Sequence, residues 1–170
     1  MTGNTATSVP PTHSASRSDI HIVNEYPHPI AKVWRALTDP ALIREWTKEG
    51  RGGRAEGFSA AVGTKFRFVA KRQPWWRGFV ECEVLEVRAP SLLRYTWVGD
   101  EGDSPTFVTY QLEPIDGGTR FTFDHSGFRG IGGFLTSKVL RRVRTRMLAK
   151  GLAEVLRGLD EGPQLEAGRS

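Results

Sequence analysis

The feature that most constrains the fold is a series of short alternating segments followed by one long helical segment. Between residues 65 and 125, apolar side chains recur at every second position in several runs, the pattern of strands with one buried face. The turn Asp116-Gly117-Gly118 joins the last two runs and indicates a hairpin. Such a sheet buries one face, and only the helical segment at about residues 133–159 is long enough to cover it. The sequence therefore predicts an α+β domain in which a curved antiparallel sheet wraps around a long C-terminal helix.

A strand and two short helices are expected ahead of this sheet. Residues 19–26 alternate apolar and polar side chains, which favours a strand. Residues 30–39 place apolar side chains at i, i+3, i+4 and i+7, the spacing of an amphipathic helix, and a second short helix is expected over residues 41–46. Residues 47–63 are rich in glycine and are expected to be irregular. We expect the two short helices to close one end of the sheet.

Both ends of the chain offer little to bury. Residues 1–18 are rich in Ser, Thr and Pro, and residues 162–170 are similar, so we predict disordered tails on either side of one domain at residues 19–161. No apolar run follows a basic start, which argues against a secretory signal. No apolar stretch approaches the roughly 18 residues of a membrane span. We therefore expect a cytoplasmic protein without a transmembrane segment.

The long helical segment carries two apolar stripes on different sides. At about 100° per residue, one side holds Leu135, Val139, Val143 and Met147. The nearly opposite side holds Leu148, Leu152, Val155, Leu156 and Leu159. One straight helix cannot bury both stripes against one sheet. Either the helix breaks near Gly151, where glycine weakens a helix, or its first half packs on something other than the sheet.

The same segment is strongly basic. The chain has a net charge of +5, and no acidic residue lies between residues 129 and 150. One interpretation is a solvated helix face. The other is a contact for a protein or an anionic partner through Lys138, Arg141, Arg142, Arg144, Arg146 and Lys150. Nothing in the pattern indicates specific recognition of nucleic acid.

Few residues suggest chemistry. The four histidines and the single cysteine show no metal-ligand spacing, so neither a metal nor another cofactor is expected. Cys82 lies between Glu81 and Glu83, whose carboxylates oppose thiolate formation, so a small buried side chain is its expected role. His125 continues the face of Phe123 and is expected at a pocket rim. There it serves either as a hydrogen-bonded structural histidine or as an acid–base group.

Several segments together resemble a known family. They are residues 33–40 (VWRALTDP) with Trp46, residues 76–87 (WRGFVECEVLEV), residues 89–90 (AP), residues 93–97 (LRYTW), residues 108–114 (VTYQLEP), residues 117–120 (GGTR) and residues 125–128 (HSGF). In this order they resemble the activator-of-Hsp90-ATPase-like branch of the START-like (SRPBCC) superfamily, over about residues 20–160. The resemblance implies a helix-grip fold with a deep apolar cavity. Members mostly bind lipids, polyketides or other hydrophobic small molecules, a minority catalyse cyclisation, and a eukaryotic branch assists Hsp90.

Two departures from the family pattern concern the last helix. Relatives often carry Gly-Trp where this chain has Gly151-Leu152. The stretch between Phe128 and Gly151 is also longer than in typical relatives, and it holds both the basic residues and the first apolar stripe. We expect this segment to decide what the pocket admits.

The strand pattern and the resemblance together give the expected ligand-binding residues. They are Trp46, Phe66, Phe68, Phe79, Tyr95, Trp97, Tyr110, Phe121, Phe123, His125, Phe128, Leu135, Met147 and Leu152. The expected function is non-catalytic binding, sequestration or transport of a hydrophobic or aromatic small molecule, such as a lipid or a polyketide-like natural product. Resistance to a toxic metabolite is one such role.

Two other function classes stay open at this point. The first is an enzyme of the polyketide cyclase or aromatase type that uses His125 or Tyr95 as an acid–base residue. The second is a protein-interaction module of the Hsp90-activator kind, with the basic segment at residues 138–150 as its contact.

Overall fold

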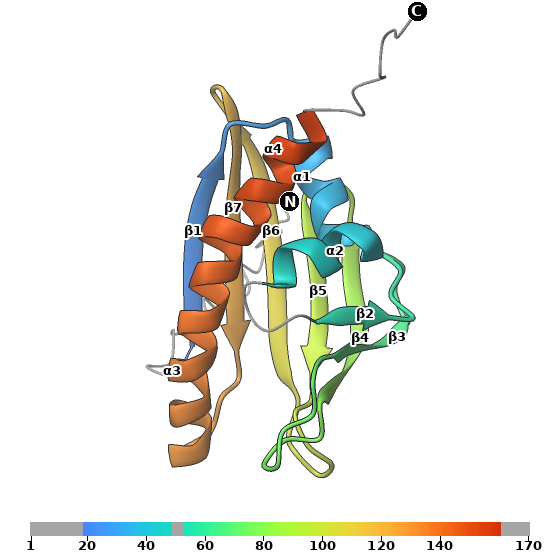
Figure 1. Ribbon diagram of the computed structural model, residues 1–170, viewed down its shortest axis with the longest axis vertical. Helices are drawn as coiled ribbons and strands as arrows, with labels where there is room; N and C mark the ends of the chain where they lie inside the picture. Colours follow the sequence, from blue (N-terminus) through green and yellow to red (C-terminus); the bar gives the residue numbers. More distant parts are fainter. Residues whose placement is uncertain (1–18, 49–52, 161–170) are drawn as a thin grey trace, which may run out of the picture.

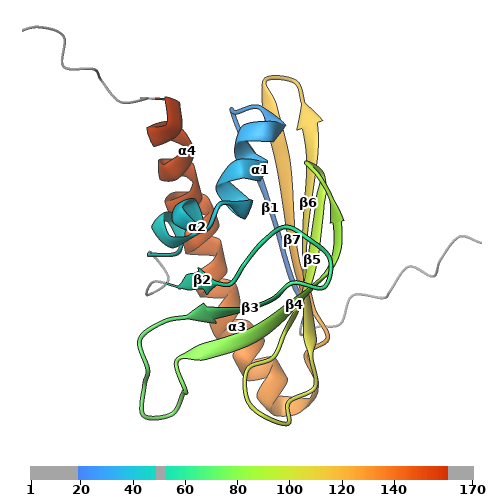
Figure 2. The same ribbon diagram turned by 90° about the vertical axis from the view of Figure 1, so that its right-hand side faces the viewer.

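Seven strands form one antiparallel sheet in the computed structural model, which describes residues 19–48 and 53–160. Their spatial order is β1-β7-β6-β5-β4-β3-β2, and every neighbouring pair is antiparallel. The strands are β1 (Ile20–Tyr26), β2 (Arg54–Glu56), β3 (Lys65–Val69), β4 (Phe79–Arg88), β5 (Leu92–Trp97), β6 (Thr106–Ile115) and β7 (Gly118–Ser126). The sheet curves around the helices, as Figure 1 and Figure 2 show, so the predicted α+β helix-grip fold is confirmed.

The helices lie on the concave face of this sheet (Figure 1). They are α1 (Ile30–Thr38), α2 (Pro40–Thr47), α3 (Gly130–Arg146), a π-helical segment η2 (Met147–Leu152) and α4 (Ala153–Asp160). The last three form one continuous rod along the sheet, and α1 and α2 contact its C-terminal end. Asp39 separates α1 from α2 and caps α2 by accepting a hydrogen bond from the backbone N–H of Ala41. The tails expected at residues 1–18 and 162–170 lie outside the described residues.

The π-helical segment explains the two apolar stripes of the rod. The helix does not end at Gly151 but passes through η2, and a π turn rotates the inward side because it holds more residues than an α turn. The second stripe faces the core after this turn. The first stripe turns away from the sheet at its start, where Leu135 is 60% and Val139 is 64% exposed. Gly151 is required by close packing, since a Cβ there would lie 2.3 Å from the carbonyl oxygen of Trp46.

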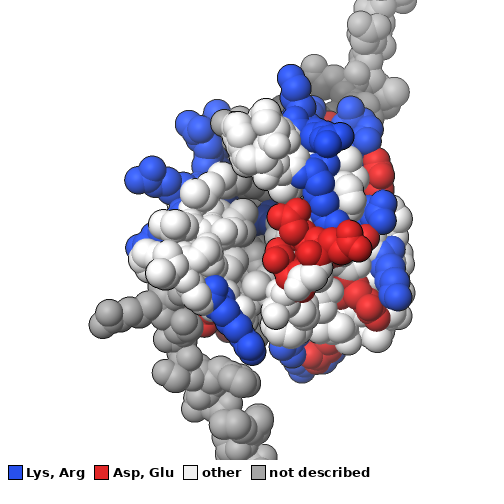
Figure 3. All heavy atoms as spheres, turned by 90° about the horizontal axis from the view of Figure 1, so that it is seen from below, with Lys and Arg blue, Asp and Glu red and all other residues white. Residues whose placement is uncertain are grey.

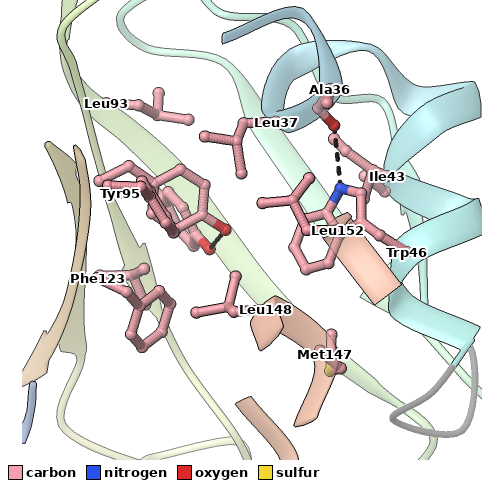
Figure 4. Close-up of a cluster of buried hydrophobic side chains, with 14 of the residues drawn as sticks. Ala36, Leu37, Ile43, Trp46, Leu93, Tyr95, Phe123, Met147, Leu148 and Leu152 are labelled. Carbon is pink, nitrogen blue, oxygen red and sulfur yellow. Dashed lines mark hydrogen bonds between the residues drawn. The ribbon is translucent and has the colours of Figure 1, made fainter. Parts of the chain in front are cut away.

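Buried contacts fix the C-terminal half of the rod against the rest of the fold. Tyr26 on β1 donates a hydrogen bond from its hydroxyl to the carbonyl oxygen of Leu148, at 2.8 Å. The indole N–H of Trp46 donates to the carbonyl oxygen of Ala36, at 3.0 Å, which joins α2 to α1 (Figure 4). These bonds satisfy polar groups inside an apolar core. The rod is therefore held rigidly at the end where α1 and α2 pack.

Candidate functional site

A cavity of about 450 Å³ opens at the opposite end of the molecule, where α3 begins. Figure 3 views the molecule from this end and shows the hollowed surface. The lining comes from the β5–β6 connection, the β7–α3 connection and the first turns of α3: Trp97, Gly99, Asp103, Ser104, Thr106, Gly127, Phe128, Arg129, Gly132, Gly133, Thr136 and Leu140. The mouth is thus framed by two connections and one helix wall.

The cavity exists because α3 carries small residues where it faces the sheet. Gly132, Gly133 and Thr136 stand at its first turns, and the next lining residue, Leu140, comes one turn later. Gly133 allows α3 to start close to β7, since a Cβ there would lie 3.2 Å from the backbone of Phe128. Farther along α3, Arg144 is the first large side chain that is buried, and Leu148, Leu152 and Leu156 follow in η2 and α4. The space between rod and sheet therefore stays unfilled at this end.

His125 lies directly behind the cavity lining. Its ring centroid is 4.5 Å from that of Phe128 and 5.7 Å from that of Trp97, and its side chain is fully buried. The hydroxyl of Thr106 donates to the carbonyl oxygen of Trp97, at 3.0 Å. That hydroxyl therefore accepts from Nε2–H of His125, at 2.8 Å, which leaves Nδ1 without a hydrogen-bond partner among the described residues. Burial, and secondly the charge of Arg144, lower the pKa of His125 to about 3, so the imidazole is neutral.

Arg144 is a buried cation beside the same residues. It lies one turn after the cavity residue Leu140 on α3, and it is only 5% exposed. Its guanidinium carbon lies 4.6 Å from the ring centroid of Trp97 and 5.7 Å from that of Phe123, so it stacks between two aromatic groups. Its Nε has no hydrogen-bond partner in the described part of the chain.

The two tyrosines form a hydrogen-bonded pair deeper in the fold. The hydroxyls of Tyr95 and Tyr110 are 2.9 Å apart, and both side chains are buried (Figure 4). Burial raises the pKa of both phenols above the ordinary value, so both are neutral at physiological pH. Burial likewise raises the pKa of the Cys82 thiol, which disfavours the reactive thiolate. No group of side chains suited to hold a metal ion is found in residues 19–48 and 53–160.

Most of the residues expected from the sequence come together in one network of ring contacts. These are Phe66, Phe68, Tyr95, Trp97, Tyr110, Phe121, Phe123, His125 and Phe128. Only Trp97 and Phe128 of this set line the cavity itself. The other rings continue from its floor toward the core. Trp46, Met147 and Leu152 are also buried, but they lie toward the end closed by α2, as Figure 4 shows.

Two of the expected residues point away from the interior of the fold. Phe79 alternates with the inward-facing Val80 on β4, and the guanidinium groups of Arg67 and Arg77 cover its ring, at 4.7 and 4.2 Å, on the outer side of the sheet. Leu135 is 60% exposed on the outer face of α3. Both corrections have the same cause: each side chain points away from the interior because of its position in the strand or helix repeat.

The basic segment also needs one correction. Lys138, Arg141, Arg142, Arg146 and Lys150 are exposed, whereas Arg144 points inward and cannot contribute to a surface contact. Its spacing contained the signal. Arg144 follows Leu140 by four positions and precedes Leu148 by four, so all three share one side of a helix.

The comparisons with known proteins identify the family. The family described as "Activator of Hsp90 ATPase homolog 1-like protein" matches residues 27–161. The chain belongs to this family. No curated protein matches it. None of the helices in the described ranges is both long and apolar enough to span a bilayer.

Solved structures show the same family fold. A protein from Mesorhizobium loti is 29% identical, with 82% of this chain and 97% of that chain covered and a TM-score of 0.69. A protein from Chromobacterium violaceum is 21% identical, with 83% and 98% covered and a TM-score of 0.66. DynU16, a protein of the dynemicin biosynthetic locus, is 21% identical, with 84% of this chain but 48% of that chain covered and a TM-score of 0.65.

Proposed function

We propose that this member of the Activator of Hsp90 ATPase homolog 1-like family binds a hydrophobic, partly aromatic small molecule without transforming it. The observation that carries the proposal is the cavity of about 450 Å³ between α3 and the open end of the sheet, floored by Trp97 and Phe128. Small-molecule sites commonly occupy roughly 300–1,000 Å³ and are mostly apolar with a few polar groups. Sequestration or transport is the role that such a cavity suits.

The chemistry of the buried groups supports binding over acid–base catalysis. A general base works best when its pKa lies near the operating pH. The pKa of His125 is lowered to about 3, so its imidazole is a weak base at neutral pH. Burial raises the pKa of Tyr95, whose phenol is engaged with Tyr110. The two residues considered for a cyclase reaction are therefore poorly matched to it.

A polyketide-like ligand is the more specific version of this proposal, and the structural likeness to DynU16 supports it. DynU16 is encoded in the dynemicin biosynthetic locus, and its likeness to this chain is one of fold. Rings stacked around the cavity floor suit flat aromatic compounds. A protective role against a toxic metabolite would follow if the bound compound is one that the host itself must tolerate.

Blocking the cavity tests the binding site. Thr136 lines the cavity, whereas Leu135 beside it is 60% exposed on the outer face of α3. We expect Thr136→Phe to weaken binding of 2-naphthamide, measured by calorimetry, by about tenfold or more, the equivalent of about 1.4 kcal/mol of lost contact. The matched control Leu135→Phe should leave the affinity unchanged. Equal affinities in both variants would rule out this site.

A second candidate is a protein contact through the outer face of α3. Leu135 and Val139 are exposed apolar side chains beside the exposed basic residues Lys138, Arg142 and Arg146. Such a face suits an acidic protein surface, for example on an Hsp90-type chaperone. Association should weaken as salt rises, because salt screens exposed charges, and Arg142→Glu should weaken it further. Binding that is insensitive to both would contradict this candidate.

A further inference from the structure

The charge of Arg144 has no counter-charge among residues 19–48 and 53–160. An ionised side chain is expensive to bury and is almost always paired when buried. Arg144 is 5% exposed and forms no ion pair or hydrogen bond with any described residue, and its Nε is one of the few buried polar atoms without a partner. Stacking on Trp97 and Phe123 offsets part of the cost but supplies no negative charge.

The neighbours of Arg144 are neutral at physiological pH. The titratable groups that interact electrostatically with it are Cys82 on β4, Tyr95 on β5, Tyr110 on β6 and His125 on β7. Burial holds the pKa of the thiol and of both phenols above their ordinary values, and it holds the pKa of the imidazole below its own. None of these side chains therefore provides an anion near neutral pH.

The charged groups at the cavity rim do not neutralise Arg144 either. Asp103 lines the rim, where its carboxylate accepts a hydrogen bond from the backbone N–H of Asp100, at 2.9 Å. Arg129 lines the same rim with the opposite charge. None of the ion pairs among the described residues joins Asp103 to Arg144. The cation thus lies behind the floor of the cavity with its charge unmatched.

Arg144 lies directly behind two residues of the cavity lining. Leu140, one turn before Arg144 on α3, and Trp97, on which the guanidinium stacks, both line the cavity. Arg144 itself is not part of the lining, so a ligand group would reach the guanidinium by displacing these two side chains. Because the protein has already removed this cation from water, an incoming anion gains a charge-assisted contact in an apolar setting without that part of the desolvation cost.

We propose that Arg144 is the anion-recognition residue of this cavity and that its ligand is an apolar acid. The carboxylate pairs with the guanidinium behind Trp97, and the apolar body of the acid fills the space between Phe128 and α3. This inference rests on the proposed binding function and specifies the chemical class of ligand.

The test compares acids with their neutral amides on two apolar bodies. 2-Naphthoate and 2-naphthamide represent a flat aromatic body, and decanoate and decanamide an aliphatic one. The unmodified protein should bind the better-fitting acid about 10–100-fold more tightly than its amide, the usual value of a hydrogen bond to a charged group. Arg144→Met should abolish this preference and retain amide binding. Arg142→Met removes the same charge from the exposed side of α3 and should keep the preference.

A stability measurement separates ligand recognition from a structural role. Replacing buried ion pairs by apolar side chains of similar volume is often neutral or stabilising, and an unpaired cation has no Coulombic partner to lose. Arg144→Met should therefore melt at the same temperature as the ligand-free protein or higher. A lower melting temperature would mean that the fold depends on the guanidinium and would overturn the assignment. If Arg144→Met does not fold, Arg144→Lys, which keeps the charge but loses the planar stack, should retain part of the preference for acids.

The outcomes distinguish the role of Arg144 from the proposed binding function of the cavity. Equal affinity of acid and amide for the unmodified protein overturns the role of Arg144 and leaves the binding function standing. A preference that survives Arg144→Met but disappears in Arg142→Met assigns it to surface charge and also overturns the inference. If neither acids nor amides bind, the proposed function fails, and the inference fails with it.

Discussion

The two halves of the C-terminal rod face the same sheet, but one half packs into the core and the other borders a cavity. In η2 and α4 the inward side chains are Leu148, Leu152 and Leu156, all fully buried, and they complete the core (Figure 4). In α3 the buried side chains are Ser137 and Arg144, and Gly132, Gly133, Thr136 and Leu140 line a cavity. A continuous helix can thus serve as core at one end and as cavity wall at the other. The two halves differ in the volume and charge of the side chains that face the sheet. The π-helical segment between them sets the angle between their inward faces.

The largest contrast between the halves should appear in stability. Leu152→Ala removes a side chain from the packed half and should lower the free energy of unfolding by about 2–5 kcal/mol. Thr136→Ala at the cavity wall should change it by about 0.5 kcal/mol or less, since it removes few contacts. Urea denaturation of both variants measures the difference. Similar losses would mean that the cavity half is packed as tightly as the core half.

Acid should weaken the fold through His125, which lies between the two halves of the interior. Its pKa is about 3 in the folded protein and about 6.5 in the unfolded chain. Because the folded pKa is the lower one, the stabilising contribution is complete above about pH 6.5 and is lost as the pH falls toward 3. Between pH 7 and pH 4 the loss should be on the order of 2–3 kcal/mol.

His125→Gln provides the control for this pH effect. The amide N–H of glutamine can still donate to Thr106, but the side chain takes up no proton in this range. The difference between the two pH–stability curves isolates the histidine from the carboxylates that also titrate. Parallel curves would show that His125 is hydrated in solution.

A smaller loss of stability is expected from Tyr95, which lies in the aromatic network between the cavity and the core. Tyr95→Phe removes the hydrogen bond that Tyr95 shares with Tyr110 and leaves one buried hydroxyl without its partner. The free energy of unfolding should fall by about 1–2 kcal/mol. If Tyr95 acts in chemistry instead, this variant should abolish turnover of a candidate polyketide with little loss of stability. Thermal unfolding and a turnover assay on the same sample separate the two roles.

The smallest effect is expected on the outer face of α3. Leu135→Ala should change the free energy of unfolding by less than about 0.5 kcal/mol, because the side chain is 60% exposed. A loss above about 1 kcal/mol would show that this face is covered in solution, for instance by a second copy of the chain. Measuring the melting temperature at two protein concentrations would reveal such a contact.

The strand pattern, the hairpin at Asp116-Gly117 and the long helical segment were sufficient to predict the α+β fold from the sequence. They are local signals, since the period of a strand and the chemistry of a turn depend on neighbouring residues. The inward direction of Phe123 and His125 also followed from alternation. The same alternation, applied to Val80 and Cys82, places Phe79 on the outside. The short strand β2 gave no such signal, because its three residues hold their shape only by pairing with β3.

The sequence by itself thus determined the order of elements, the curved sheet around a helix and the aromatic face turned toward that helix. Only the tertiary structure decided which side of the rod meets the sheet. That depends on the π turn and on the close approach of Gly151 to Trp46, which join segments far apart in the chain. The same packing decided that Arg144, one of several arginines in a basic run, is the one enclosed. The four-residue spacing of Leu140, Arg144 and Leu148 places them on one side of a helix, but only the packing against the sheet shows that this side is the enclosed one.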